Sequence, residues 1–451
     1  MAMTAIEEFA SSLHALTTRD VSGPVRTKLQ WHVVDTIGAW MAASRTAEGA
    51  ALLAFRLRMR QADGDADDVL LEVATNCALA RLSEVDDIHL ASMTTPSSIV
   101  IPGALTLARS WQAAPADVTA AMLAGYEAMT RLGGAIGGPH VLHRGIWPTY
   151  FAAPFAMAAV AARLLRLDAG QTAHALALAL TCAAPGVGHH NATTTSRWFA
   201  VGNAARNGVT AAFAAQAGFT ADVKLLDGAF FANVYGITPD MAALTQDRSE
   251  PVLTHISFKP WCAARQTMAA TEALRQLIAD GVAPDAMTEI RVAVLPPHQK
   301  MIDHGVVAGD RASHLTSVHY QLALAAHRPD SVYDLAQSPR DLSPALRTFM
   351  GRIKVEGDDK LLEAYPHAWP ARISVATPAG TRPKDVMHVP GDPARPFDWP
   401  QLAEKFRRVV APALGPEQAE AMPARIAESL DDRQLLARLV DEVNEICRQG
   451  G

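Results

Sequence analysis

Two kinds of hydrophobic pattern divide the chain, and the change between them falls near residue 285. Before this point, apolar residues recur every three or four positions, which is typical of amphipathic helices. In the segment 26–43 the apolar stripe consists of Leu29, Val33, Ile37, Trp40 and Met41. The same spacing or an almost wholly apolar run predicts further helices over 117–136, 151–165, 171–182 and 204–216. Their alanine content favours helix and lets buried helices pack closely.

Beyond residue 285 the pattern acquires a period of two, which is typical of β-strands. It runs through 289–295, 352–356 and 373–377, and a fourth strand is predicted near Val386 and His388 after a turn at 378–380. Helical patterns lie between the first two strands, and three more follow over 400–446.

These patterns predict a mainly α protein with two domains. A large all-helical domain would comprise residues 1–265 and 395–451. A smaller α+β two-layer lid domain, residues 266–394, would be inserted before the C-terminal helices, which we expect to pack back on the first domain.

Composition excludes several classes of protein. With 49% hydrophobic and 19% charged residues the chain is not intrinsically disordered, and a net charge of −6 offers no basic surface for nucleic acid. The most apolar stretch, 151–165, is shorter than a membrane span and contains Arg163. The N-terminus has no signal-peptide pattern, and four scattered cysteines form no CxxC pair. We expect a cytoplasmic protein without membrane or nucleic-acid partners.

One polar segment stands directly before an apolar helix. Residues 84–89 contain three carboxylates, two of them Asp86 and Asp87, together with His89, and the segment 94–98 follows. One interpretation is a reactive loop, because functional groups often lie on loops held by a rigid scaffold. The other is a helix-capping loop in which Ser97 or Ser98 is the N-cap.

Three later segments also place polar groups beside apolar runs: 143–150, 193–208 and 257–262. The last contains Lys259, one of the few lysines, between aromatic residues. A lysine in an apolar setting can act as a base, although it can also be a surface lysine whose stem lies on apolar neighbours. His189 and His190 have no further ligand at a metal-binding spacing, so no metal site is predicted.

Several of these segments, taken in order, resemble the MmgE/PrpD family, which includes 2-methylcitrate dehydratase, cis-aconitate decarboxylase and iminodisuccinate epimerase. The matching motifs are Asp35-Thr36-Ile37-Gly38, Glu84-x-Asp86-Asp87 with Pro96-Ser97-Ser98, Gly145-x-x-Pro148-Thr149, Gly202-x-Ala204-Ala205-x-Asn207-Gly208, Lys259-Pro260, and Gly391-Asp392-Pro393 with Glu404-Lys405-Phe406. Each is weak alone, but together they extend over nearly the whole chain.

The resemblance implies a helical domain and a lid domain with the active site between them, and no metal or organic cofactor. It implies a small di- or tricarboxylate substrate and a lyase, either a dehydratase or a decarboxylase, that removes a proton next to a carboxylate. An epimerase or isomerase and a non-catalytic ligand-binding member remain alternatives. We also expect a homodimer.

The resemblance also assigns roles to individual residues. Lys259 would be the base or the cation that stabilises the enolate, Asp86 or Asp87 would orient a neighbour, and His89 or Tyr150 would carry the proton. The remaining residues expected to bind substrate are Arg144, Arg197, Thr95, Ser97, Trp147 and Tyr320.

Some family positions differ in this chain. Two family histidines correspond to Thr95 and Trp147, and a family lysine corresponds to Arg197. His89, His143, Tyr150 and His319 are therefore the candidates to take over proton transfer.

Overall fold

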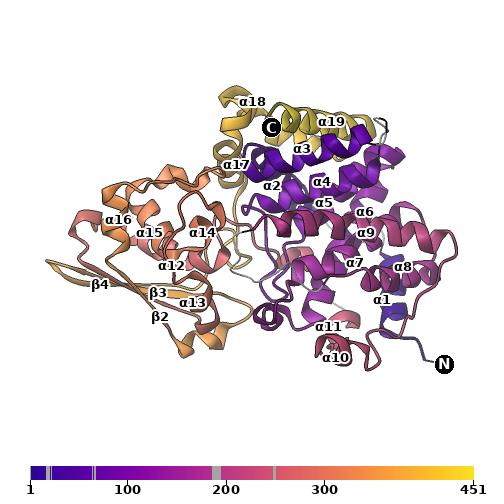
Figure 1. Cartoon of the computed structure of the whole chain (residues 1–451), viewed down its shortest axis with the longest axis horizontal. Helices are drawn as coiled ribbons and strands as arrows, with labels where there is room; N and C mark the ends of the chain where they lie inside the picture. Colours follow the sequence, from indigo (N-terminus) through magenta and orange to yellow (C-terminus); the bar gives the residue numbers. More distant parts are fainter. Residues whose placement is uncertain are drawn as a thin grey trace. The chain divides into compact units, whose positions relative to one another are not determined.

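The protein is described by a computed structural model that covers residues 2–16, 21, 23–62, 64, 68–184, 194–246 and 250–450. It divides into two compact units, which are described separately (Figure 1). The first unit comprises Met1–Ile256 and Trp399–Gly451, and the second comprises Ser257–Asp398. The corresponding boundaries predicted from the sequence follow residues 265 and 394.

The described part of the first unit is built from helices. In chain order they are α1 (Ala5–Ala15), α2 (Gly23–Ala43), α3 (Ala47–Ala62), α4 (Val69–Leu82), α5 (Ser97–Trp111), α6 (Pro115–Ala135), η2 (Gly138–Arg144), α7 (Pro148–Leu164), α8 (Ala169–Thr181), α9 (Ser196–Gln216), α10 (Phe230–Tyr235), α11 (Met241–Thr245), η3 (Val252–His255), α17 (Trp399–Leu414), α18 (Pro416–Ser429) and α19 (Arg433–Gly450). The C-terminal helices thus belong to the first unit, where α17 packs against α2.

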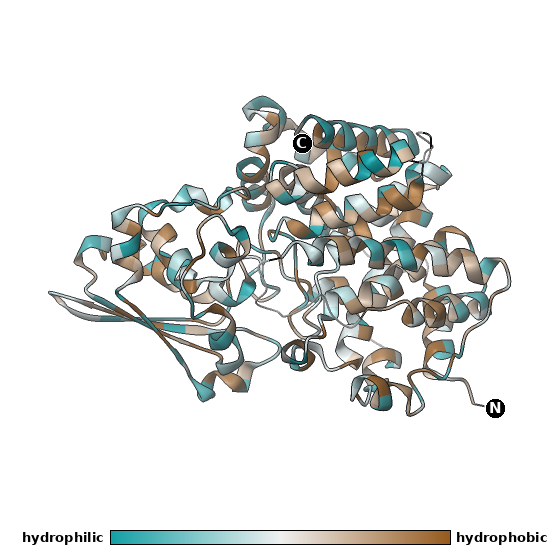
Figure 2. Cartoon of the chain, in the orientation of Figure 1, coloured by the Kyte–Doolittle hydropathy of each residue, from teal (hydrophilic) through white to brown (hydrophobic). Residues whose placement is uncertain are grey.

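Helices α5 and α7 form the interior of this unit, and nearly every residue of α7 is buried. By contrast, α19 carries both hydrophilic and hydrophobic positions, as an outer helix with one buried face should (Figure 2). No helix in the described ranges of the chain is long and apolar enough to cross a membrane.

Two glycines set the distance between neighbouring helices of the interior. A Cβ at Gly208 of α9 would lie 2.2 Å from the carbonyl oxygen of Pro154 in α7, and one at Gly202 would lie 2.5 Å from that of Ala74 in α4. A Cβ essentially never lies this close to a non-bonded atom, so only glycine permits these crossings. Both glycines belong to the motif over 202–208, which therefore has a packing role in the fold.

The second unit is a layer of helices on a four-stranded sheet with strand order β2-β1-β3-β4. Strand β1 (Glu289–Val294) is parallel to β2 (Ile353–Gly357) and antiparallel to β3 (Ala371–Thr377), which forms a hairpin with β4 (Gly380–Val386). The other elements are α12 (Arg265–Ala279), η4 (Pro284–Ala286), α13 (Pro296–Ile302), α14 (Arg311–Thr316), α15 (Val318–His327), η5 (Pro329–Tyr333), α16 (Pro344–Met350) and η6 (Asp359–Ala364).

The alternation seen in the sequence matches the burial of this sheet. Ile290, Val292 and Val294 of β1 point into the core, together with Ile373 and Val375 of β3. Helix α12 covers the same side, because it packs against β3 and β4. The fold class predicted from the sequence, mainly α with a small α+β part, is confirmed.

Candidate active site

The loop between α4 and α5 carries both predicted aspartates. Asp86 and Asp87 are each 1% exposed, so neither carboxylate can be solvated by bulk water. Although adjacent in sequence, they have different partners. One carboxylate faces arginine, and the other faces histidine and hydroxyl groups.

Asp86 pairs with Arg81 in the last turn of α4. The Nη1 of Arg81 donates to Oδ1 of Asp86 over 3.1 Å, and Nη2 lies 3.3 Å from a carboxylate oxygen of Glu84. Burial lowers the pKa of Arg81, but the carboxylates of Asp86 and Glu84 together raise it above its ordinary value. The guanidinium therefore stays charged in the interior, as a buried ion needs a partner of opposite charge.

Two further elements of the first unit bring aromatic and basic side chains to this pair. The guanidinium carbon of Arg197, in the first turn of α9, lies 4.9 Å from the ring centre of Trp147 and 5.4 Å from that of Trp198. The ring of Trp198 in turn lies 5.9 Å from the guanidinium carbon of Arg81. Cation–π contacts of this kind hold an arginine side chain against aromatic rings.

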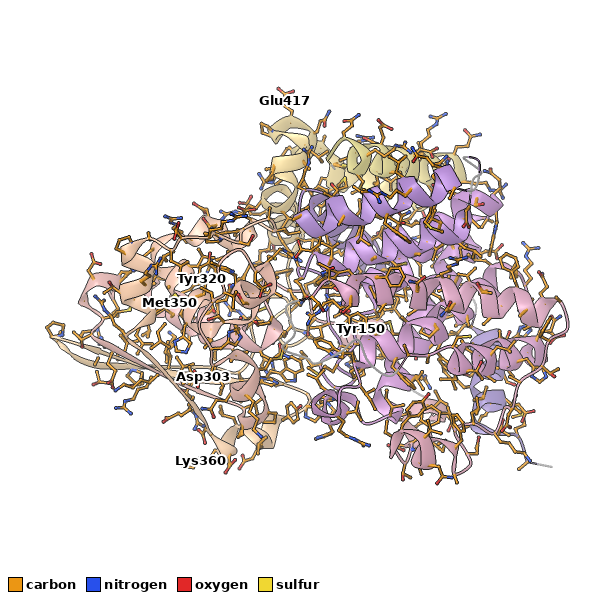
Figure 3. The ribbon with its side chains drawn as sticks, viewed as in Figure 1. Tyr150, Asp303, Tyr320, Met350, Lys360 and Glu417 are labelled. Atoms are coloured by element: carbon orange, nitrogen blue, oxygen red, sulfur yellow. The ribbon has the colours of Figure 1, made fainter. Side chains whose placement is uncertain are left out.

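Tyr150, labelled in Figure 3, lies in the first turn of α7, and its ring centre is 5.6 Å from that of Trp147. Burial raises the pKa of Tyr150, whereas the charges of Arg81 and Arg197 act in the opposite direction. Its hydroxyl is thus protonated at neutral pH and can donate a hydrogen bond or a proton. These neighbours are called the arginine–tryptophan cluster, which consists of Arg81, Glu84, Asp86, Trp147, Tyr150, Arg197 and Trp198.

Asp87 belongs to a second group of buried side chains. Its Oδ2 accepts a hydrogen bond from Nδ1 of His32 over 2.8 Å, and its Oδ1 accepts one from the backbone N–H of Ser97 over 3.1 Å. The Ser97 hydroxyl also donates to Asp87 and contacts the hydroxyl of Tyr126. Burial lowers the pKa of His32, with the Asp87 hydrogen bond opposing it. We call these four residues the Asp87 network.

The interpretation of Ser97 or Ser98 as an N-cap is wrong. The N-cap of α5 is Pro96, which makes no side-chain capping bond, and both serines lie within the helix. The Ser98 hydroxyl donates to the carbonyl of Thr95 instead. Ser97 can reach Asp87 because the loop folds back on the first turn of α5.

The Asp87 network is fixed from the C-terminal part of the chain. The ammonium of Lys405 in α17 lies 2.6 Å from a carboxylate oxygen of Asp35 and donates to the carbonyl of Val85 over 3.1 Å. Burial raises the pKa of Asp35 to about 6, while Lys405 acts in the opposite direction. The motifs around Asp35 and Lys405 are far apart in sequence but in contact in the structure. Through Lys405 they hold Val85, the residue before Asp86.

His89 and Thr95 lie in the same loop, in two separate hydrogen-bonding groups. The Nδ1 of His89 lies 2.8 Å from the hydroxyl of Ser92 and accepts from the backbone N–H of the same residue over 3.3 Å. The backbone N–H of Thr95 donates to the hydroxyl of Thr149 in α7 over 3.1 Å. His89 is 9% exposed, so its ring is almost wholly enclosed by the protein.

Arg144 has other partners than the residues of the arginine–tryptophan cluster. It is exposed, and its guanidinium donates to the carbonyl oxygens of Tyr235 and Gly236 at the end of α10. These contacts explain the residue as a clamp on a helix terminus. The side chain of His143 and the pair His189 and His190 lie outside the described part of the chain.

The two remaining predicted residues belong to the second unit. Lys259 and Tyr320 are both buried, and the Tyr320 ring meets the edge of His314 at 4.8 Å. Burial raises the pKa of Tyr320 to about 12. His319, a candidate for proton transfer, instead places Nε2 2.9 Å from Asp303.

Arg81 and Trp198 belong to the cluster although neither is among the residues predicted from the sequence. Arg81 is the one basic residue in α4 and stands three residues before Glu84, a spacing that could have indicated an ion pair. Trp198 follows Arg197 directly. In the described ranges, no group of three or more His, Cys, Asp or Glu side chains is arranged to hold a metal ion.

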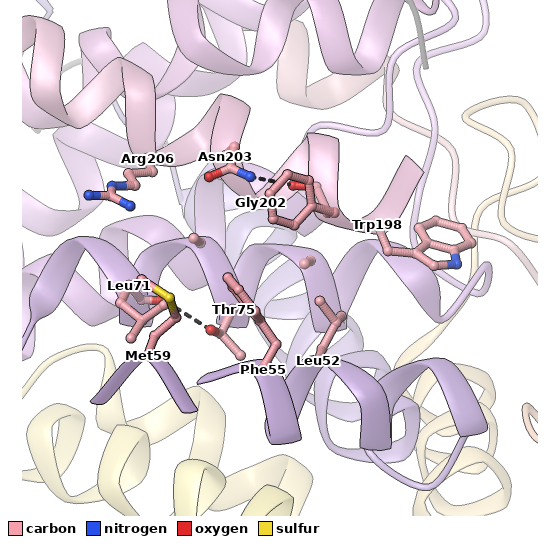
Figure 4. Close-up of a pocket in the computed structure, with 12 residues that line it drawn as sticks. Leu52, Phe55, Met59, Leu71, Thr75, Trp198, Gly202, Asn203 and Arg206 are labelled. Carbon is pink, nitrogen blue, oxygen red and sulfur yellow. Dashed lines mark hydrogen bonds between the residues drawn. The ribbon is translucent and has the colours of Figure 1, made fainter. Parts of the chain in front are cut away.

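An apolar groove of about 370 Å³, open solvent included, lies between α3, α4 and α9 (Figure 4). Its lining residues are Leu52, Phe55, Met59, Leu71, Ala74, Thr75, Ala78, Trp198, Phe199, Gly202, Asn203 and Arg206. It shares Trp198 with the arginine–tryptophan cluster but contains none of the predicted site residues. With few polar groups, the groove offers less for acid–base chemistry than the cluster does.

Comparison with known proteins agrees with these motifs. Residues 7–241 match the MmgE/PrpD N-terminal domain, and residues 261–432 match the MmgE/PrpD C-terminal domain. The chain is 22% identical to human cis-aconitate decarboxylase over 454 aligned positions, covering 94% of this chain and 92% of that protein. Because the two domain matches together cover most of its length, the chain belongs to the MmgE/PrpD family.

Proposed function

We propose that the protein is a lyase, a dehydratase or a decarboxylase, that acts on a small di- or tricarboxylate without a metal or organic cofactor. Family membership and the similarity to cis-aconitate decarboxylase support this reaction class. The observation that carries the proposal is the arginine–tryptophan cluster. It places two guanidinium groups and a protonated, buried tyrosine beside an acidic loop.

The chemistry follows from what these groups can do. In a dehydratase, a base takes the proton from the carbon next to a carboxylate, and the electron pair moves into that carboxylate to form an enediolate. The pair then returns to form the double bond, and hydroxide leaves with a proton as water. In a decarboxylase, CO₂ leaves with its bonding pair left behind, and the carbanion takes a proton.

Both routes build negative charge beside a carboxylate, which positioned cations stabilise. Arg197 would bind the substrate carboxylate, and Arg81, held by Asp86, would add positive charge. Tyr150, which burial keeps protonated, suits the role of proton donor. Lys259 would be the base or a further cation, as the resemblance implies.

The proposal is tested with a panel of di- and tricarboxylates incubated in D₂O and followed by NMR. A lyase releases water or CO₂ and yields an unsaturated or shortened acid. An epimerase or isomerase exchanges the C–H proton and inverts or moves it without releasing either product. Binding without exchange or release would contradict the proposal and favour a non-catalytic member.

Replacing Arg197 with lysine is expected to lower kcat/KM by about 10- to 100-fold, although the charge is kept. The lysine ammonium cannot bind a carboxylate through two parallel hydrogen bonds, and it stacks less well between two indole rings. Steady-state kinetics measure the effect, and the matched control is Arg206→Lys, on the same helix. Unchanged kinetics in Arg197→Lys would remove this residue from the site.

A further inference from the structure

Three hydrogen-bond donors of the arginine–tryptophan cluster are buried and have no acceptor among the residues that the structure describes. They are the indole N–H of Trp147, the hydroxyl of Tyr150 and the Nε–H of Arg81. Buried donors are nearly always paired, because leaving one unpaired is destabilising. Three of them within one group of contacting side chains therefore require an explanation.

The chemistry of the three groups identifies what would satisfy them. The indole and guanidinium nitrogens only donate hydrogen bonds, and burial keeps the tyrosine hydroxyl protonated. Of the two guanidinium groups in the cluster, that of Arg81 is paired with Asp86 and Glu84, and that of Arg197 lies on the rings of Trp147 and Trp198. A group with several acceptor oxygens and a negative charge complements such a set, and a carboxylate has two oxygens with about four acceptor sites.

The position of Trp147 in the fold also favours a negatively charged ligand here. Trp147 is the N-cap of α7, a helix of 17 residues, and makes no side-chain capping bond there. Tyr150 follows one turn later, so both donors project from the same end of one helix. The start of a long helix carries partial positive charge, which favours an anion at this end.

We propose that the Trp147 indole N–H, the Tyr150 hydroxyl and the Arg81 Nε–H form a carboxylate-binding subsite, in which Trp147 is a binding and specificity-determining residue. An indole N–H donates a hydrogen bond but does not release its proton in water. Trp147 therefore binds charge and does not transfer a proton. The inference deepens the proposed function and depends on it only for the choice of a polycarboxylate as ligand.

The test uses propane-1,2,3-tricarboxylate, which lacks a hydroxyl leaving group, with its uncharged triamide as the control ligand. The indole N–H resonances of ¹⁵N-labelled protein are followed by NMR during titration. The Trp147 signal is assigned by its loss in Trp147→Phe, and Trp111→Phe, in which a tryptophan packed on Phe213 is changed, is the matched control. We expect the Trp147 proton to shift downfield with the tricarboxylate and to stay in place with the triamide.

Calorimetry of the same variants measures the loss of the hydrogen bond. Phenylalanine keeps an aromatic ring beside Arg197 but removes the N–H, so Trp147→Phe should bind the tricarboxylate about tenfold more weakly. Trp111→Phe should bind like the unchanged protein. A Trp147 signal that does not move, or equal affinity in Trp147→Phe, would overturn the subsite.

The two proposals fail in different ways. If the tricarboxylate shifts the Trp147 signal but no acid of the panel exchanges or reacts, the subsite stands and the lyase does not. If acids react while Trp147→Phe retains full affinity for the tricarboxylate, the lyase stands and the subsite does not. Thermal melting of each variant shows whether the fold is retained before either conclusion is drawn.

Discussion

Replacing Lys259 with alanine is expected to lower kcat by about two or more orders of magnitude, the scale of losing one positioned group that stabilises developing charge. Lys259 is buried next to two buried aromatic residues, Phe258 and Trp261. A cation with little water around it acts strongly on a nearby developing negative charge. The family resemblance assigns the chemistry to this lysine, and kcat on the acid found active in the panel measures it.

Two further variants separate chemistry from folding. Lys259→Met keeps most of the apolar stem, so it should fold like the unchanged protein and lose activity as Lys259→Ala does. Lys300→Ala removes an exposed lysine of α13 and should leave both kcat and stability unchanged. Normal turnover by Lys259→Met would transfer the chemistry to the arginine–tryptophan cluster and His89.

Much of the fold could be predicted from the sequence, because burial follows local periodicity. The stripe from Leu29 to Met41 lies in α2, and the alternation over 289–295 corresponds to β1. The predicted starts of α7 and α9 were less accurate. Helix α7 begins at Pro148, where proline suits the first helical position, and α9 begins at Ser196, eight residues before the predicted start at Ala204. The polar residues at the start of α9 hid its helical period.

The predicted site residues lie in separate groups, because the direction of each side chain depends on contacts between segments that are distant in the sequence. Asp86 and Asp87 are neighbours, yet the loop turns them toward Arg81 and His32 respectively. Which way each points depends on contacts with α2 and α17, far away in the chain. Arg144, which the sequence predicts as a carboxylate-binding residue, donates in the structure to backbone carbonyls at the end of α10.

Motifs that resemble functional signatures also divide into chemical and structural ones. Gly202 and Gly208 allow close helix crossings, and Lys405 holds Asp35 and the carbonyl of Val85. Of these residues, Lys405 supports the loop that carries Asp86, whereas the two glycines fix the spacing of α9 from α4 and α7. A motif match alone does not distinguish such a support from a group that touches substrate, because both depend on particular residue types.

The largest effect on stability is expected from Asp392, which forms a buried ion pair with Arg265 at the start of α12. One guanidinium nitrogen of Arg265 lies 2.9 and 2.7 Å from the two carboxylate oxygens, and both side chains are 1% exposed. Asp392 also accepts the backbone N–H of Val389 over 2.9 Å. The loop is therefore fixed to both the helix and the end of the sheet.

Asp392→Ala should lower the free energy of unfolding by about 3–5 kcal/mol, because it leaves the Arg265 charge buried without its partner. The double variant Arg265→Met with Asp392→Leu removes both charges and should recover most of that loss. Urea denaturation of the unchanged protein and the two variants at neutral pH measures these differences. Equal losses in the single and double variants would attribute the effect to packing and not to the unpaired charge.

Asp392→Ala should also reduce activity at temperatures where the variant remains folded. The carbonyl of Gly391 accepts the backbone N–H of Phe258 over 3.0 Å, and a Cβ at Gly391 would lie 2.7 Å from the carbonyl oxygen of Phe258. The loop thus holds the residue before Lys259 in close contact. If Lys259 acts as proposed, a looser loop lowers kcat in Asp392→Ala. The double variant restores stability without the ion pair. Its kcat should recover only as far as the loop keeps its position. A kcat that stays unchanged in Asp392→Ala would show that activity does not depend on the Arg265–Asp392 ion pair.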